Sequence, residues 1–335
     1  MSTSTLRQFY FLLILAFFAM LPACGRDAGE ERVAGAASDP PRTVTPSDVR
    51  VIIMLIDGPR YSETFETPAH VHFMWNTLRP LGTVCTNFRN LGETLTNSGH
   101  GSLLTGIWQH IADDALTRPS DPTLFEYYRK ATGAPVSDAI LLGGKTTLDA
   151  VSYSNSPAYG AAYKATSAVF TLSDVATYNQ LIQYLDQQSP HLVVCSLSDT
   201  DKVAHSRSWN GYLKAIENAD SLIALTWNHV QADPDYAGKT YLFVSADHGR
   251  HDDAHGDVNE HGDSCDGCQH LLFLALGPGI IANQQIDTAY NQRDLCRTVG
   301  QILGVSTPQS EGVVMSDLFV PLPTGVLTTR SQTKP

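Results

Sequence analysis

The chain has 335 residues, and its 34 acidic and 22 basic side chains give it a formal net charge of −12 at pH 7. With 42% hydrophobic and 17% charged residues, it is too apolar for a disordered chain and long enough for one large domain or two small ones. The acidic balance argues against a nucleic-acid-binding module, which would carry a basic surface.

The N-terminal segment is typical of a targeting signal. After Arg7, an apolar run of 13 residues extends from Phe9 to Leu21, which is shorter than a membrane-spanning helix and suits a secretory signal. It ends in an L-P-A-C segment that resembles a bacterial lipobox, so residues 1–23 are predicted to be a signal peptide and Cys24 a lipidated membrane attachment. Simple cleavage and an uncleaved anchor are the alternatives. Residues 24–48 are predicted to be a flexible tether, and the protein to be exported to the periplasm or cell envelope.

From Val51 onward, short β-branched apolar runs alternate with segments of helix length. The runs are continuous, as in strands that are covered on both faces of a mostly parallel sheet. Strands are predicted at Val51–Ile56, Ala139–Leu142, Leu192–Leu197, Tyr241–Ser245 and Leu271–Leu276, and helices at Leu124–Thr132, Asp174–Gln187, Gly211–Val230 and Arg293–Leu303. The pattern predicts an α/β fold, a three-layer α/β/α sandwich over residues 49–322 with a C-terminal tail at 323–335. The stretch 107–137 is a candidate for an elaborated loop over a site.

Acidic residues and histidines follow the predicted strands. Ligands bind at the carboxyl ends of strands in such sheets, so these residues are candidates for a site. Asp57 follows the first strand, Asp201 and His205 follow the third, and Asp247 and His248 follow the fourth. One Asp after a strand is most often a cap or turn residue, but carboxylates at three strand ends, two with His, are harder to explain in that way.

Histidines are concentrated in one short part of the chain. Five of the 12 His fall between Asp247 and His270, together with seven acidic residues. A solvated acidic loop explains the acids but not the imidazoles. Imidazole and carboxylate together suit zinc or a related divalent cation, so this segment predicts a metal site.

The candidate nucleophile lies in the segment GETLTNSGHGSLLTG, residues 92–106. Thr96 precedes a glycine-containing turn and a helix-like run from Gly101 to Leu104, so its hydroxyl is expected at a helix N-terminus, which attracts anions. The alternative is that Thr96 is only a helix cap. Because an ordinary hydroxyl needs a metal or a base to act as a nucleophile, the predicted metal ligands would supply that activation.

The order of these motifs resembles the alkaline phosphatase superfamily, closest to its phosphodiesterase/nucleotide-pyrophosphatase and Thr-nucleophile phosphatase branches. The matching segments are VIIMLIDG, residues 96–106, Asp201-x3-His205, Asp247-His248-Gly249, His261-Gly262, LLFLALGPGI and RDLCRTVGQILGV. The resemblance implies an alkaline-phosphatase-like fold and a phosphoric ester hydrolase, either a phosphatase or a phosphodiesterase.

The resemblance also implies two divalent metal ions, with zinc favoured. One ion would be held by Asp57, Thr96, Asp247 and His248, and the other by Asp201, His205 and His261. Thr96 would attack phosphorus and form a phosphothreonyl intermediate, which a water on the second metal would then hydrolyse. The expected partner is a small phosphorylated or sulfated ester substrate.

Other functions on the same scaffold stay open. They are a sulfuric- or phosphonic-ester hydrolase, a phosphomutase, and a non-catalytic metal-bound lipoprotein of the cell envelope. The predicted export signal argues against a mutase. A binding protein has no need of an activated Thr96, which argues against the lipoprotein.

Lys145 is a further candidate for the site, and two histidines compete with His261. Lys145 follows the second strand and could bind a phosphate oxygen, or it could be an ordinary exposed lysine. One monoesterase branch carries Lys-x-Arg here, and this chain lacks that Arg, so the choice between monoester and diester stays open. His255 and His270 compete with His261 as the third ligand of the second metal. His261 is preferred because the His261-Gly262 pair precedes the LLFLALGPGI segment by about the interval that the resemblance implies.

Five cysteines remain after Cys24. Cys85 opens a CTNFR segment that superficially resembles a formylglycine-sulfatase signature, but the corresponding position falls on Thr96, so Cys85 is predicted to be a buried strand thiol. Cys265 and Cys268 are expected to form a local disulfide, with a small separate zinc site as the alternative.

Overall fold

The computed structural model describes residues 48–256 and 258–321. The predicted signal peptide, Cys24, the tether up to residue 47 and the tail at 323–335 lie outside the described residues. Within the described ranges, no helix has both the length and the apolar character needed to cross a bilayer.

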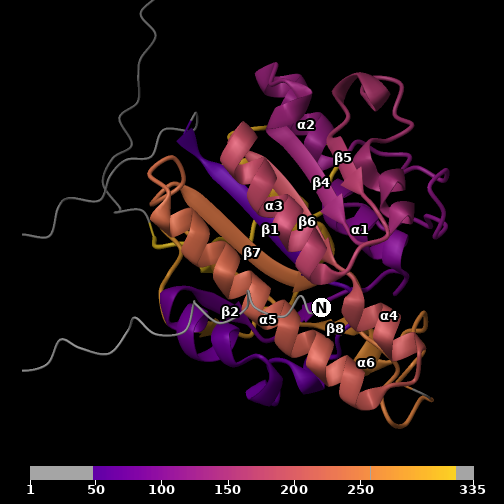
Figure 1. The fold of residues 1–335 in the computed structure, drawn as a ribbon. Coiled ribbons are helices and arrows are strands. Elements are labelled where there is room, and N and C mark those ends of the chain that lie inside the picture. The colour runs from indigo at the N-terminus through magenta and orange to yellow at the C-terminus, as the bar shows by residue number, and fades with distance from the viewer. Residues whose placement is uncertain (1–47, 257, 322–335) are drawn as a thin grey trace, which may run out of the picture. The chain divides into compact units, whose positions relative to one another are not determined.

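The centre of the fold is a large sheet. Its strands are β1 (Arg50–Ile56), β2 (Thr83–Cys85), β4 (Ala139–Gly143), β5 (Thr166–Val169), β6 (Leu192–Leu197), β7 (Thr240–Ala246), β9 (Leu274–Leu276) and β10 (Gln284–Ile286). They form an eight-stranded sheet in the order β10-β2-β9-β7-β1-β6-β4-β5 (Figure 1). All neighbouring pairs are parallel except those of β9, which runs antiparallel between β2 and β7. A second sheet joins β11 (Tyr290–Asn291), β3 (Phe88–Arg89) and β8 (His270–Leu271).

Helices cover both faces of the large sheet. The α-helices are α1 (Thr96–Thr105), α2 (Leu124–Thr132), α3 (Asp174–Gln188), α4 (Asp199–His205), α5 (Trp209–Ala232), α6 (Asp266–Gln269) and α7 (Gln292–Ile302). Short 3-10 helices span Tyr61–Glu63, Pro68–His70, Arg79–Leu81, Val136–Asp138, Thr146–Ser152, Gly160–Tyr163 and Ser316–Leu318, and a π-helix spans Met74–Leu78. Helices α3 and α5 pack together against the sheet on the face turned toward the viewer in Figure 1, and α1, α2 and α7 pack together on the other face.

The three-layer α/β/α prediction is therefore confirmed. The central strands β6 and β4 are buried along their whole length, and β1 is buried from Val51 onward. Continuous apolar runs are what a strand needs when helices cover both of its faces, which is why these strands were predictable to within a residue or two.

One predicted strand is wrong. The run Leu271–Leu276 was expected to be a single strand, but the structure divides it between β8 in the small sheet and β9 in the large one. Leu272 and Phe273, which connect the two strands, are fully buried. An apolar run reports burial and not the identity of the pairing partner, so the sequence could not reveal the change of sheet.

The start of α1 also differs from the prediction. The helix begins at Thr96, without the expected glycine-containing turn, and runs through both glycines. A Cβ on Gly99 would stand 2.3 Å from the carbonyl oxygen of Asp247, and a Cβ on Gly101 would stand 2.2 Å from Cδ1 of Ile111. These two glycines therefore allow close packing of a helix and do not mark a turn.

Candidate active site

Four adjacent strands deliver candidate residues to one edge of the sheet. Asp57 follows β1 directly, Asp247 follows β7 directly, Lys145 lies two residues after β4, and Asp201 lies in the first turn of α4, just after β6. These strands are neighbours in the order β7-β1-β6-β4 and run parallel, so their carboxyl ends meet. The sheet itself brings the four side chains together.

Asp247 is the point at which α1 docks onto this edge. Its carbonyl oxygen accepts hydrogen bonds from Asn90 Nδ2 at 2.9 Å and Gln292 Nε2 at 2.6 Å, and Gly99 packs against it. Gly58 N donates to Asp247 Oδ1 at 3.2 Å. These contacts fix the carboxylate and place the first turn of α1, with Thr96, over the strand ends.

The first cluster consists of Asp57, Asp247 and His248, whose ligand atoms lie within 4.8 Å of one another. All three residues are fully buried. His248 Nε2 lies 3.5 Å from Asp57 Oδ1 and 3.6 Å from Asp247 Oδ2, and Thr96 Oγ1 lies 3.4 Å from the same nitrogen. Because His248 Nδ1 is 2.8 Å from the carbonyl oxygen of Gly249, the proton is assigned to Nδ1, which leaves the Nε2 lone pair directed at the cluster.

The second cluster consists of Asp201, His205 and His261. His205 Nε2 lies 3.2 Å from Asp201 Oδ1 and 3.2 Å from His261 Nε2, and His261 Nε2 lies 3.5 Å from Asp201 Oδ1. His261 Nδ1 is 2.8 Å from the carbonyl oxygen of Thr94, so its Nε2 also faces the cluster. The rings of His248 and His261 stack with their centroids 3.8 Å apart, which makes the two clusters contiguous.

The chemistry of these donors fits divalent cations. Within the described residues, no hydrogen bond reaches the buried atoms Asp57 Oδ1 and Asp247 Oδ2. Burial, followed by the charge of Asp247, raises the pKa of Asp57 well above its usual range, and burial lowers the pKa of His248 to about 3. Imidazole nitrogens and carboxylate oxygens that converge and are left without a hydrogen bond are what a metal ion requires.

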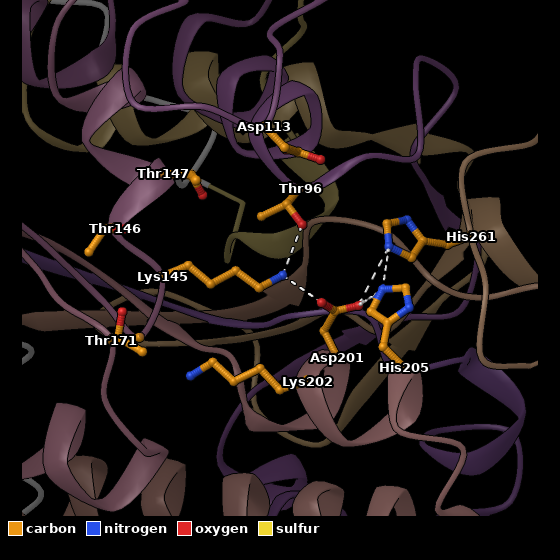
Figure 2. A pocket seen from close by; sticks show the side chains of 11 residues that line it. Thr96, Asp113, Lys145, Thr146, Thr147, Thr171, Asp201, Lys202, His205 and His261 are labelled. Carbon is orange, nitrogen blue, oxygen red and sulfur yellow. Dashed lines mark hydrogen bonds and ion pairs between the residues drawn. The ribbon is translucent and has the colours of Figure 1, made fainter.

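Lys145 lies between the two clusters. Its Nζ is 2.7 Å from Asp57 Oδ2, 2.6 Å from Asp201 Oδ2 and 3.1 Å from Thr96 Oγ1, and Figure 2 shows it pointing at Thr96 and Asp201. Burial disfavours its charge, but the two carboxylates outweigh that cost and raise the pKa of Lys145 above its usual range. The ammonium group thus neutralises the carboxylates that a metal would also neutralise.

A cavity of about 360 Å³ opens in front of these groups (Figure 2). It is lined by Thr96, Asp113, Gly144, Lys145, Thr146, Thr147, Thr171, Asp201, Lys202, His205 and His261. The lining side chains are hydroxyls, carboxylates, ammonium groups and imidazoles, so the cavity suits a small polar or charged ligand more than an apolar one.

Asp113 is a functional candidate that sequence reasoning missed. It lies in the connection between α1 and α2, and its Oδ1 accepts a hydrogen bond from the backbone N of Asn97 at 2.7 Å. That amide belongs to the first turn of α1, next to Thr96, where the helix attracts anions. The predicted loop over the site therefore contributes a carboxylate at this position, and nothing in the local sequence marks it.

His100 is a second residue that the prediction left out. It lies one helical turn after Thr96, where its Nδ1 is 2.8 Å from the Thr96 carbonyl oxygen and 3.3 Å from Asp247 Oδ2. Its Nε2 is 3.0 Å from Ser196 Oγ on β6. The i+4 spacing from Thr96 was the signal that could have identified it.

Arg250 is the third such residue, and it is fully buried. Its guanidinium donates to the carbonyl oxygen of Asp201 at 3.2 Å, forms an ion pair with Asp201 Oδ1, and donates to the carbonyl oxygen of Asn259 at 2.8 Å. It connects the second cluster to the loop that carries His261. An Arg two residues after His248 was visible in the sequence, but its partner was not.

The competing residues lie elsewhere. His270 begins β8, where its Nε2 is 2.8 Å from the carbonyl oxygen of Thr86, and its ring stacks on Tyr61. His255 is exposed and pairs with Asp252 at 2.6 Å. Of the three candidate histidines, the structure places His261 beside Asp201.

The cysteines agree with the predictions in part. Cys85 ends β2 and is fully buried, as predicted. Cys265 and Cys268 are free thiols, so the expected disulfide is wrong. Burial raises the pKa of the Cys268 thiol to about 12, so this thiol is less reactive than an exposed one.

Comparisons with known proteins bear on the family and the fold of the chain. Residues 156–283 match a family model described as the Metalloenzyme superfamily. No curated protein matches the chain by sequence.

Several solved structures are similar in fold. A 2-O GAG sulfatase matches with a TM-score of 0.64 and 13% identity over 80% of this chain and 73% of its own. Murine ectonucleotide pyrophosphatase/phosphodiesterase 5, in an inactive Thr-to-Ala form in complex with AMP, matches with a TM-score of 0.61 and 14% identity. The match covers 81% of this chain and 100% of the murine one. A phosphonate monoester hydrolase from Silicibacter pomeroyi matches with a TM-score of 0.59 and 12% identity over 82% of this chain and 77% of its own. At these identities the likeness is one of fold.

Proposed function

We propose that this chain is a member of the alkaline phosphatase superfamily and a metal-dependent hydrolase of phosphate esters that acts through Thr96; its fold and its metalloenzyme match over residues 156–283 support this. Its structural neighbours include sulfatases, phosphodiesterases and phosphonate hydrolases. The fold therefore does not choose among these esters, and the choice rests on the residues of the site.

The observation that carries the proposal is the position of the Thr96 hydroxyl. It lies in the first turn of α1, faces the cavity, and is 3.4 Å from His248 Nε2 and 3.1 Å from Lys145 Nζ. A formylglycine sulfatase would need a Cys at this position. The inactive form of the murine phosphodiesterase carries a Thr-to-Ala substitution, which supports a threonine nucleophile in this fold.

The two clusters are proposed to hold two divalent metal ions, with zinc favoured by the mixture of imidazole and carboxylate. One ion would be held by Asp57, Thr96, Asp247 and His248, and the other by Asp201, His205 and His261. When bound, such ions would lower the pKa of a hydroxyl or water and stabilise negative charge on phosphoryl oxygens.

The chain's own groups would then carry the transfer. Thr96 Oγ1 forms a bond to phosphorus as the bond from phosphorus to the alcohol oxygen breaks, and water later displaces Thr96 from phosphorus. Lys145, 3.1 Å from Thr96 Oγ1, is placed to bind a non-bridging oxygen of the same phosphoryl group. His100 holds the backbone of Thr96, and Arg250 holds Asp201, so both are positioning residues.

Asp113 bears on the class of phosphate ester. Its carboxylate accepts a hydrogen bond from the Asn97 amide at 2.7 Å, beside the nucleophile. Without this carboxylate, the positive N-terminal end of α1 would attract a phosphoryl oxygen at the same place. A monoester dianion brings one more negative charge to this carboxylate than a diester monoanion does. We therefore expect Asp113 to favour diesters.

The test is turnover by the Thr96→Ala variant. We expect it to retain bound metal and to lose turnover of activated aryl phosphates by at least about a thousandfold, because the hydroxyl that attacks phosphorus is gone. Thr96→Ser should retain measurable turnover. Thr132→Ala, at the end of α2, is the matched control and should behave like the parent protein.

Equal turnover by Thr96→Ala and the parent would show that another group is the nucleophile. Parallel assays with aryl monoester, diester and sulfate substrates separate the phosphate-ester proposal from the sulfatase alternative. A preparation that hydrolyses only the sulfate would overturn the proposal.

Export and attachment through Cys24 are also proposed, on the basis of the apolar run and the L-P-A-C segment. Metabolic labelling with a fatty acid should mark the parent protein and not Cys24→Ser. Label in both proteins, or in neither, would contradict lipidation at Cys24.

A further inference from the structure

We propose that the loop after β7 holds a separate zinc site, formed by Cys265, Cys268, His251 and Asp263. This site shares no residue with the two clusters at the sheet edge, and the inference stands whether or not the chain hydrolyses phosphate esters.

The spacing of the residues is the first indication. Cys265 and Cys268 form a Cys-x2-Cys pair, and His251 and His255 form a His-x3-His pair on the preceding stretch. Paired cysteines and paired histidines at such spacings are typical of structural zinc sites. The pattern alone does not show which of these side chains converge.

The geometry shows the convergence. One ligand atom each from His251, Asp263 and Cys268 lies within 4.8 Å of the others, and His251 Nε2 is 3.4 Å from Asp263 Oδ2. Cys265 N donates to Asp263 Oδ1 at 2.9 Å, Cys268 N donates to the carbonyl oxygen of Cys265 at 3.1 Å, and both thiols are close enough to Asp263 to lower the pKa of its carboxyl group. Since zinc binds such ligands at about 2.0–2.3 Å in a tetrahedron, His251, Asp263 and Cys268 need only small movements to enclose it, and Cys265, on the same turn as Cys268, would have to turn inward as the fourth ligand.

The backbone holds the two halves of this cluster side by side. Gly249 N donates to Cys268 O at 2.8 Å, and Arg250 N donates to Gly267 O at 2.9 Å. A Cβ on Gly267 would stand 2.4 Å from the carbonyl oxygen of Arg250, so only glycine allows this approach. The turn that carries both cysteines is therefore fixed against the chain that leads into His251.

The choice of metal follows from the ligands. Two thiolates, one imidazole and one carboxylate form a softer set than the imidazoles and carboxylates of the sheet edge, and paired cysteine thiolates favour zinc among available divalent ions. A metal lowers the pKa of a thiol that binds it, so protonated thiols in the metal-free protein do not oppose the site.

The site would brace the part of the loop that carries His261. His251 precedes His261 in the chain, and Asp263 follows it by two residues. A metal bound to both would fix the loop on each side of His261, whose Nε2 lies 3.5 Å from Asp201 Oδ1. The zinc would thus be structural, and it would act on the candidate active site through the position of one imidazole.

Two other uses of these residues are the rivals. Asp252, His255 and Cys265 form a second group within 4.8 Å, but its histidine is exposed, whereas His251 of the first group is only partly exposed. A Cys265–Cys268 disulfide is the other rival, and it would leave no thiolate for a metal. Contact of both thiols with Asp263 favours the proposed set.

The experiment uses the full chain, purified with its thiols reduced, stripped of metal and reloaded with Co²⁺. Cobalt bound to thiolates gives a charge-transfer absorption that imidazole and carboxylate ligands do not give. We expect this band in the parent protein and in Asp201→Asn, which alters only the sheet-edge site. We expect its loss in the Cys265→Ser/Cys268→Ser double variant, together with loss of one zinc per chain after reloading with Zn²⁺.

His229→Ala is the matched control, because His229 also pairs with a carboxylate, Asp186 Oδ1 at 2.9 Å, but lies on α5. It should keep the band. No band in the reduced parent, or a band that persists without the two cysteines, would overturn the proposal.

A second measurement avoids dependence on the variant's folding. Removal of zinc from the parent protein should increase protease cleavage at residues 258–262, and added Zn²⁺ should restore protection. The double variant should be cleaved rapidly with or without Zn²⁺. Cleavage of the parent that is indifferent to zinc would contradict the bracing role.

Discussion

The two groups of candidate metal ligands are built in different ways. The group at the sheet edge collects Asp57, Asp201 and Asp247 from three separate strand ends, and these carboxylates are buried. The loop group lies between His251 and Cys268, and Asp263 within it is exposed. The first group is positioned by the whole sheet, whereas the second depends on one turn. A metal therefore adds chemistry to the first and rigidity to the second.

The electrostatics follow the same division. At the sheet edge, burial and the neighbouring Asp247 raise the pKa of Asp57 well above its usual range. Negative charge on these carboxylates is therefore unfavourable without a cation beside them. In the loop, hydrogen bonds from Cys265 lower the pKa of Asp263 to about 2. Asp263 is therefore already an anion before any metal binds. The thiols of Cys265 and Cys268 are the groups that would have to lose a proton when a metal binds.

The largest predicted effect comes from a matched pair of substitutions on α4. Asp201→Asn should lower bound metal and reduce turnover by at least about a thousandfold, because it removes a charge that the second cation needs. Asp199→Asn, two residues earlier, should retain metal and turnover, since Asp199 Oδ2 instead accepts a hydrogen bond from Asp174 N at 2.9 Å. Metal analysis and kcat/KM with an aryl phosphate test the pair.

Circular dichroism of both variants controls for misfolding, because Asp201 also pairs with the buried Arg250. Equal metal content in Asp201→Asn and Asp199→Asn would contradict the assignment of the second cluster.

Much of the sheet-edge group could be predicted from sequence for a simple physical reason. Buried parallel strands read as apolar runs, and polar residues that directly follow them must meet at one edge. This rule alone predicts that Asp57 and Asp247 lie close together. His205 was assigned through the family resemblance, in which an Asp and a His separated by three residues bind the second metal.

The remaining features depend on tertiary contacts that no local pattern reports. Arg250 can be buried because its guanidinium donates a hydrogen bond to Asp201. Asp113 is a candidate site residue because its carboxylate accepts a hydrogen bond from the Asn97 amide. The disulfide was predicted from the Cys-x2-Cys spacing and the expected export of the chain, without knowledge of the carboxylate beside both thiols.

An intermediate effect is predicted for the two glycines of α1, which differ in what surrounds them. Gly99→Ala should lower the free energy of unfolding by about 1–3 kcal/mol and reduce turnover, because its Cβ would meet the Asp247 backbone at 2.3 Å. Gly101→Ala should cost less, since its Cβ would meet Cδ1 of Ile111, the end of a flexible side chain. Chemical unfolding and kcat compare the two, and an equal loss in both would show that α1 does not depend on its contact with Asp247.

The smallest predicted effect concerns substrate choice at the cavity and involves neither group of metal ligands directly. Asp113→Asn keeps an oxygen that can accept the Asn97 amide but removes the charge, so turnover of aryl monoesters should rise about fivefold relative to diesters, as expected for about 1 kcal/mol of repulsion near solvent. Asp114→Asn is the matched control, because Asp114 Oδ1 accepts from the backbone of Leu116 and Thr117.

The two kcat/KM values for each variant give the ratio directly. Added salt should shrink the difference between Asp113→Asn and the parent, since the repulsion is screened. A ratio that is unchanged in Asp113→Asn, or changed equally in Asp114→Asn, would mean that the carboxylate beside the nucleophile does not select between the two ester classes. Selection would then have to come from the cationic side of the cavity, where Lys145 and Lys202 lie.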